Sequence, residues 1–253
     1  MAKGDILILV EGERERKFFA KLNSLLPEKG IRMTLVPFRY NIYSLYREME
    51  EYGFDIELEK AIQLSKRINP GEKKLLEEKR FEAKYLIFDL DLHALELPEE
   101  KRMEAIPKML EVFNDDSDNG LLLLNYPMFE SIREIHHLDG ADTLPTFPVR
   151  NGAQYKREMD SNGRPVDLKH FSFDTYCDLL KDSLILTNSI LDNPHRMPTR
   201  DEALKMDSVS VWKKQKELID REQKVYCLNT SIQFLLAYFG FDKIKSWMDK
   251  SKK

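Results

Sequence analysis

The first half of the chain carries four short strand-like runs, each bounded by polar residues. They are Ile6–Val10, Ile31–Phe38, Tyr85–Phe88 and Leu121–Leu124. Apolar runs of this length are typical of strands in a parallel sheet that is covered on both faces. Helical patterns separate the runs, so strands and helices alternate along the chain. This order predicts an α/β fold with a mainly parallel, Rossmann-like sheet that is flanked by helices.

The longest of these helical patterns lies between the second and third runs. Residues 42–81 are helical in composition, with breaks at Gly53 and at residues 69–71. Because this stretch is longer than a crossover between two strands requires, we expect a helical insertion over residues 43–82. A further helix is predicted over residues 98–113, with two glutamates near its positive end.

The second half of the chain changes character. Glycine and proline recur at short intervals between residues 142 and 170, which predicts a long loop or a hairpin. Beyond it, helical spacing predicts a helix from Phe173, one that begins at Thr199 with Glu202 at capping-box spacing, and one through Val225–Phe239. We therefore predict an α/β domain over residues 1–142, a loop-rich connection over 143–170 and an α-helical region over 171–253.

Acidic residues follow two of the predicted strands directly. Glu11 comes after the first run and before Gly12, and Asp89 and Asp91 come after the third run. The carboxyl ends of neighbouring parallel strands meet at one edge of a sheet, where ligands collect. Residues two apart on an extended chain point to the same side, so we expect the two aspartates to face one way. Clustered carboxylates repel one another unless a cation lies between them, and these hard oxygen ligands suit Mg²⁺ or Mn²⁺.

Other charged residues are weaker candidates for the same site. Glu15 lies one helical turn beyond Glu11 and either binds metal or stays solvated on the helix. Glu130 either reaches the metal or only begins a helix. Lys156 and Arg157 form a basic pair in the segment rich in glycine and proline, where a contact with substrate phosphate competes with a solvated position.

The order of these motifs resembles a known family. Val10-Glu11-Gly12, with Glu15 four residues after Glu11, and a later strand ending in Asp89-Leu90-Asp91 are similar to the Toprim domain. Asn125-Tyr126-Pro127-Met128-Phe129-Glu130 adds a similarity to the OLD-type and RloB-like Toprim nucleases of bacterial phage defence, although a tyrosine separates the asparagine from the proline here. The resemblance covers about residues 5–135.

The resemblance implies a nuclease that cleaves phosphodiester bonds in DNA or RNA with Mg²⁺ or Mn²⁺ bound by Glu11, Asp89 and Asp91. Bound cations would neutralise phosphate charge, lower the pKa of an attacking water and stabilise the leaving oxygen. The implied setting is antiviral defence, with a separate ATPase or other defence protein as partner and a homo-oligomer as one assembly. The chain itself has no GxxxxGK[ST] phosphate loop.

Two other functions remain open at this point. Residues 86–91, Leu-Ile-Phe-Asp-Leu-Asp, also resemble the start of a haloacid-dehalogenase-type phosphohydrolase, with Asp89 as nucleophile and Asp91 as acid or base. That family usually continues with Gly-Thr, where this chain has Leu92-His93. Alternatively, the acidic cluster senses a phosphate ligand through a metal, and the helical second half binds a protein partner.

Composition limits the class of protein and the cellular location that we expect. The 253 residues are 42% hydrophobic and 33% charged, which is typical of a globular chain with a real core. A net charge of −4 argues against binding nucleic acid by bulk charge, but it leaves local basic patches open. Cys177 and Cys227 are the only cysteines and suggest reduced thiols. No apolar run approaches the length of a membrane span, so we expect a soluble cytoplasmic protein without a membrane partner.

Overall fold

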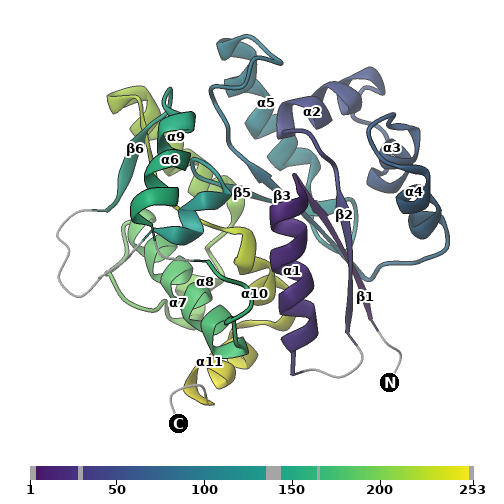
Figure 1. Ribbon diagram of the computed structural model, residues 1–253. Helices are drawn as coiled ribbons and strands as arrows, with labels where there is room; N and C mark the ends of the chain where they lie inside the picture. The colour runs from purple at the N-terminus through teal and green to yellow at the C-terminus, as the bar shows by residue number, and fades with distance from the viewer. Residues whose placement is uncertain (1–3, 28–30, 135–143, 164–165, 251–253) are drawn as a thin grey trace. The chain divides into compact units, whose positions relative to one another are not determined.

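The computed structural model describes residues 4–27, 31–134, 144–163 and 166–250. The chain forms two compact units, whose elements are labelled in Figure 1. The first unit contains residues 1–88 and 94–123, and the second contains residues 89–93 and 124–253. The division therefore passes through the ends of two strands and differs from the boundary that we expected at residue 142.

A five-stranded sheet, with strand order β2-β1-β3-β5-β4, supports the first unit. β1 runs parallel to both β2 and β3, and the short β4 runs antiparallel to β5. The core of β1 is completely buried, as its apolar run predicts. The predicted α/β fold with a mainly parallel sheet is thus confirmed. The strands are β1 (Asp5–Val10), β2 (Arg32–Pro37), β3 (Ala83–Asp89), β4 (Asn114–Asp115) and β5 (Gly120–Asn125).

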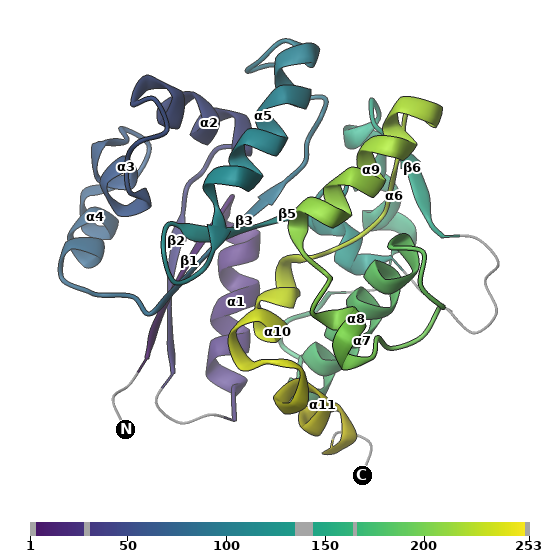
Figure 2. The same ribbon diagram turned by 180° about the vertical axis from the view of Figure 1, so that it is seen from behind.

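Helices flank this sheet. α1 (Glu13–Leu25) lies in front of the sheet in Figure 1, and α5 (Glu99–Val112) lies in front of it in the opposite view of Figure 2. Between β2 and β3 come α2 (Ile42–Glu51), α3 (Leu58–Leu64) and α4 (Pro70–Glu77), within the stretch where we expect a helical insertion. Asn69 caps α4 through a capping box with Glu72, so the break expected at residues 69–71 is a helix start.

The second unit is mainly helical, and α7 (Phe173–Ile190) is its longest helix among the described residues. α7 contacts α8, α9 and α11. The capping box that the sequence predicts is present, because the Glu202 carboxylate accepts from the Thr199 N–H at 2.6 Å. The other elements are η1 (Phe129–Arg133), β6 (Thr146–Pro148), α6 (Gly152–Asn162), α8 (Arg200–Ala203), α9 (Ser208–Glu222), β7 (Lys224–Tyr226), η2 (Ser231–Gln233), α10 (Phe234–Phe239) and α11 (Phe241–Lys250).

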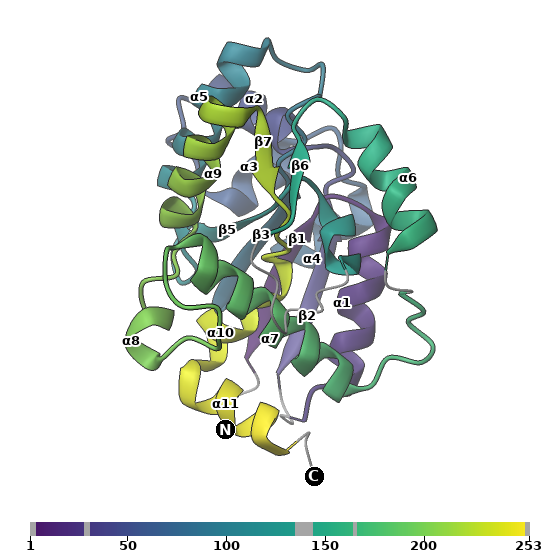
Figure 3. The ribbon, with the colours of Figure 1, turned by 90° about the vertical axis from the view of Figure 1, so that its left-hand side faces the viewer.

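Two predictions for the second half are wrong. Residues 152–162 form α6 rather than part of a loop, because Tyr155 and Met159, four positions apart, give a mostly polar helix one buried face. The helix expected through Val225–Phe239 is instead β7, η2 and α10 in succession. Val225 pairs with Phe147 in a two-stranded antiparallel sheet, and Figure 3 shows β6 and β7 side by side. Cross-strand pairing overrides the helical spacing there.

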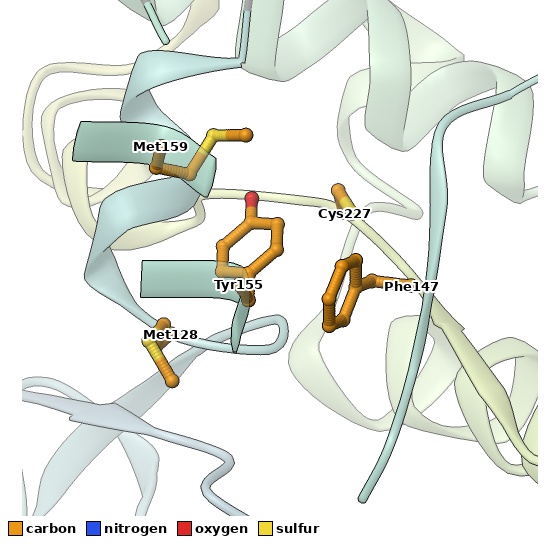
Figure 4. Close-up of a cluster of buried hydrophobic side chains, with 5 residues drawn as sticks. All are labelled: Met128, Phe147, Tyr155, Met159 and Cys227. Carbon is orange, nitrogen blue, oxygen red and sulfur yellow. The ribbon is translucent and has the colours of Figure 1, made fainter. Parts of the chain in front are cut away.

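A sulfur-rich apolar cluster links these elements of the second unit, as Figure 4 shows. The rings of Phe147 and Tyr155 meet edge to face with their centroids 4.8 Å apart. The Tyr155 hydroxyl donates to the Glu134 carboxylate at 3.2 Å, which satisfies the one polar atom of its ring. Burial raises the pKa of the Cys227 thiol well above its ordinary value. Met128 and Met159 complete the cluster.

No helix among the described residues is long and apolar enough to cross a membrane.

Candidate functional site

Two of the predicted acidic positions stand at the carboxyl ends of adjacent strands, β1 and β3. Val10 pairs with Ile87 in the parallel β1–β3 ladder. Glu11 follows Val10, and Asp89 ends β3 two residues after Ile87, so both come at the carboxyl edge, where α/β sheets bind ligands. Glu11 belongs to the first unit, whereas Asp89 and Asp91 belong to the second.

Glu11 is half-buried, and its backbone is fixed from the neighbouring strand. The Arg39 N–H donates to the Glu11 carbonyl at 2.8 Å. Arg39 itself stands just beyond β2 with a φ of 68°, in the left-handed region. Its guanidinium makes two hydrogen bonds of 2.8 Å to the Glu72 carboxylate, which raise the pKa of Arg39. Sequence reasoning missed this arginine, which is the first charged side chain beyond β2.

Glu15, the possible further metal ligand, has a structural role in its own helix. Its carboxylate accepts from the Gly12 N–H at 3.0 Å at the start of α1, which is the glutamate half of a capping box, since glycine has no side chain to form the other half. The side chain is buried, with 8% of its surface exposed. A carboxylate in this position satisfies a helix-end donor and matches the helix dipole. The solvated position that we considered for Glu15 is wrong, because the side chain is buried, and its role as a metal ligand stays a prediction.

Asp89 is held by Asn125, which lies at the end of β5. The Asn125 amide donates to the Asp89 carboxylate at 3.1 Å, and the Leu90 N–H donates to the Asn125 carbonyl at 3.0 Å. The side-chain oxygen of Asn125 accepts from the Ser231 N–H at 3.2 Å. Because that contact needs an oxygen, the amide nitrogen must face Asp89. The asparagine is completely buried.

Asn125 was absent from the predicted site, although its signal resembles that of the acidic residues. It follows the apolar run Leu121–Leu124 directly, just as Glu11 follows the first run and Asp89 the third. An uncharged amide carries no hint of metal chemistry, so its role as a partner of Asp89 emerges only from the folded structure.

Asp91 differs from its expected geometry. β3 ends at Asp89, and Asp91 has a φ of 43°. The extended backbone on which the same-side prediction depended therefore does not reach Asp91. Its N–H donates to the Pro127 carbonyl at 3.3 Å, and its carboxylate lies 3.0 Å from the Nδ1 of His93. The His93 ring is so close to Gly152 that a side chain there would overlap it.

Glu130 and Lys156 form an ion pair within the second unit. Their charged atoms are 3.6 Å apart, with 5% of the Glu130 side chain exposed and 55% of the Lys156 side chain exposed. Glu130 lies in the first turn of η1, and Lys156 lies on α6 beside the exposed Arg157. The predicted basic pair is thus exposed on a helix, not on a loop, and one member already has an acidic partner.

The donor chemistry of the candidate site suits a hard divalent cation, since it offers carboxylate oxygens at a sheet edge. Within the described ranges, no three His, Cys, Asp or Glu side chains are grouped so that they could hold a metal ion. Several of the acidic groups are engaged elsewhere, as for Glu15 with Gly12 and Glu130 with Lys156. The residue types therefore fit Mg²⁺ or Mn²⁺, while a preassembled three-ligand group is not present among these residues.

Comparison with models of known protein families, with curated proteins and with solved structures finds no match to this chain.

Proposed function

We propose that this protein is a Toprim-type, metal-dependent nuclease that cleaves phosphodiester bonds in DNA or RNA. The observation that carries the proposal is the register of the parallel strands. Val10 is paired with Ile87, so a glutamate and an aspartate follow adjacent strands at the edge where α/β sheets bind their ligands. The sequence Asp89-Leu90-Asp91 at the end of β3 supports the same assignment.

Each residue has a distinct role in this proposal. Glu11, Asp89 and Asp91 would hold Mg²⁺ or Mn²⁺, and Glu11 would also move a proton as general acid or base. When bound, the ion supplies charge neutralisation at the phosphate and a lowered pKa for the attacking water. Asn125 orients the Asp89 carboxylate through its 3.1 Å hydrogen bond. Lys156 and Arg157 would contact substrate phosphate from α6.

The proposed setting is bacterial defence against phage, with the chain in the cytoplasm. Because the sequence lacks a GxxxxGK[ST] phosphate loop, any ATP hydrolysis of that type would come from a separate partner protein. The helical region of residues 171–253 would provide the surface for that partner or for a second copy of the chain.

The test is cleavage of plasmid DNA, single-stranded DNA and tRNA by the purified protein, with and without Mn²⁺. We expect metal-dependent cleavage of at least one substrate, and loss of most of that activity in Glu11→Gln, Asp89→Asn and Asp91→Asn. Glu13→Gln is the matched control, because Glu13 is an exposed acid two residues beyond Glu11. A metal-dependent rise in melting temperature should accompany activity and be reduced in the three amide variants.

Glu11→Gln also separates this proposal from the alternatives. A phosphohydrolase that uses Asp89 as nucleophile needs no glutamate at position 11, so full activity of Glu11→Gln on a phosphate monoester would contradict the nuclease assignment. An absence of cleavage under all conditions, together with a metal-dependent melting shift that the three amide variants reduce, would instead favour a non-catalytic phosphate-sensing module.

A further inference from the structure

A cleft of about 480 Å³ lies between α2 and α3 in the helical insertion of the first unit. Its volume falls in the range of small-molecule sites, which is about 300–1,000 Å³. Figure 1 shows the two helices next to one another beyond the end of β2. None of the predicted catalytic residues lines the cleft.

The face of α2 that lines the cleft is polar. Ser44, Arg47, Glu48 and Glu51 follow the spacing of one helical face and all contribute to the cleft. The opposite face carries Ile42, Leu45 and Met49, which are completely buried. The apolar face of α2 therefore already has its packing partners, so the cleft has a polar wall that is suited to a polar ligand.

A stacked pair of side chains is part of the lining of the cleft. The guanidinium carbon of Arg67 lies 3.9 Å from the centroid of the Tyr40 ring. Glu48 fixes this guanidinium by accepting from its Nε at 2.9 Å and also accepts from the Ser65 hydroxyl at 3.0 Å. Tyr40 nevertheless keeps 46% of its surface exposed, and a second exposed tyrosine, Tyr52, lines the same cleft. Exposed tyrosine and arginine planes are the surfaces on which unpaired nucleobases stack.

The charge of the cleft differs from that of the whole chain. Three basic residues, Arg47, Lys66 and Arg67, line it against two acidic residues, Glu48 and Glu51. The lining is therefore net positive, although the chain has a net charge of −4. Arg47 and Lys66 are exposed, whereas Glu48 is paired with Arg67. An anionic ligand thus meets two exposed cations and one exposed acid.

The cleft begins beside the edge of the sheet that carries Glu11. The Arg39 N–H binds the Glu11 carbonyl at 2.8 Å, and Tyr40 is the next residue along the chain. The left-handed φ of 68° at Arg39 turns the chain from β2 toward α2, and the Asn41 side chain then caps α2. A ligand that is bound at Tyr40 would therefore lie close to the backbone of Glu11.

We propose that the cleft between α2 and α3 binds one nucleotide of a single-stranded nucleic acid. Its base stacks on the Tyr40–Arg67 pair, and its phosphates lie at Arg47 and Lys66. A single strand is required because a paired base offers no open face for stacking. The choice of a nucleic acid rests on the proposed nuclease function, while the cleft and its stacked pair are observed independently of it.

The test is fluorescence anisotropy of a labelled single-stranded 12-mer with the full chain in EDTA, where cleavage does not contribute. Tyr40→Leu should weaken binding about 5- to 150-fold, the range for loss of one base-stacking side chain, and Tyr40→Phe should retain affinity. Arg47→Ala with Lys66→Ala should lower the slope of log affinity against log salt by about 0.7 for each lost phosphate contact. Lys60→Ala is the matched control, since this exposed lysine of α3 does not line the cleft.

An abasic strand of the same length separates stacking from simple charge attraction. We expect it to bind wild type as weakly as the normal strand binds Tyr40→Leu. Equal affinity of wild type for both strands, an unchanged affinity of Tyr40→Leu, or no binding of the 12-mer would each overturn the proposal. If the protein cleaves nucleic acid but Tyr40→Leu binds the 12-mer as tightly as wild type, the nuclease function stands and the nucleotide site in the cleft is rejected. If binding depends on Tyr40 but no substrate is cleaved, the nucleotide site stands and the nuclease function is rejected.

Discussion

A single substitution can replace the hydrogen bond between Asn125 and Asp89 with a repulsion between two carboxylates. Asn125→Asp keeps the oxygen that accepts from the Ser231 N–H but replaces the amide donor, 3.1 Å from Asp89, with a second carboxylate oxygen. At that separation, two unit charges repel by about 5 kcal/mol at an effective dielectric constant of about 20. Protonating one aspartate at pH 7 costs only about 4 kcal/mol, given an ordinary pKa of about 3.9. Uptake of a proton by one of the two aspartates therefore limits the loss of folding free energy.

We expect Asn125→Asp to lower the free energy of unfolding by about 2–4 kcal/mol at pH 7, the lower figure allowing for solvent screening of the half-buried Asp89. The native variant takes up a proton that the unfolded chain releases, so its stability relative to wild type should rise as pH falls from 7 to 5. Protonation of either carboxyl also restores a donor between the two side chains.

Urea denaturation at several pH values, followed by tryptophan fluorescence, measures this loss. Both tryptophans, Trp212 and Trp247, lie in the same compact unit as Asn125 and report on its unfolding. Asn162→Asp is the control, because it adds the same charge at an exposed position on α6 of the same unit. A loss below about 1 kcal/mol at pH 7, less than the cost of breaking one buried charge-assisted hydrogen bond, would refute the reasoning. So would a loss that is constant across the pH range.

Three further predictions concern other contacts. Gly152→Ala should displace the His93 ring and destabilise the second unit by about 1–3 kcal/mol, the cost of overpacking, which thermal unfolding would detect; an unchanged melting temperature would contradict the close approach. Burial raises the pKa of the Cys177 thiol to about 11, so a thiol reagent at pH 8 should label it only after denaturation, and rapid labelling of the native chain would be inconsistent with that burial. Burial alone raises the pKa of the Glu72 carboxyl, but the hydrogen bonds and charge of Arg39 lower it by more, so the net pKa is below its ordinary value. The pair therefore stabilises the fold above the ordinary glutamate pKa, and this stabilisation is lost as the pH falls through the lowered pKa. Glu72→Gln should therefore cost about 1 kcal/mol at pH 7 and less at pH 3, as urea titration at the two pH values would reveal.

The strands were predictable because their burial is encoded locally. Ile6–Val10 and Tyr85–Phe88 are short apolar runs, and both are fully buried in the sheet. Capping signals are local as well, which is why Thr199 and Glu202 identified the start of α8 correctly. These features require only neighbouring residues, so no knowledge of distant contacts is needed to recognise them.

The missed features depend on contacts between distant residues. α6 looks like a loop in sequence because only Tyr155 and Met159 mark its buried face, and their cluster is completed by Phe147 and Cys227 from β6 and the segment after β7. Helical spacing predicted a helix at Val225, because the spacing of nearby residues contains no information about the distant strand that pairs with Val225. At the candidate site, the sequence identified the acidic positions but not which donor each carboxylate would meet.

Two residues with left-handed backbone stand just beyond strands of the sheet, whereas Phe54, Asp192 and Gln223 adopt the same region elsewhere in the described chain. Arg39 and Asp91 each stand two residues beyond the end of a strand, β2 and β3, with φ values of 68° and 43°. Such conformations cost about 1–3 kcal/mol for a residue other than glycine and are concentrated at functional sites. Glycine would remove that cost at either position, but it would also remove the Arg39 bonds to Glu72 and the Asp91 contact with His93. The side chains at these two turns are therefore better explained by what they contact than by the path of the backbone.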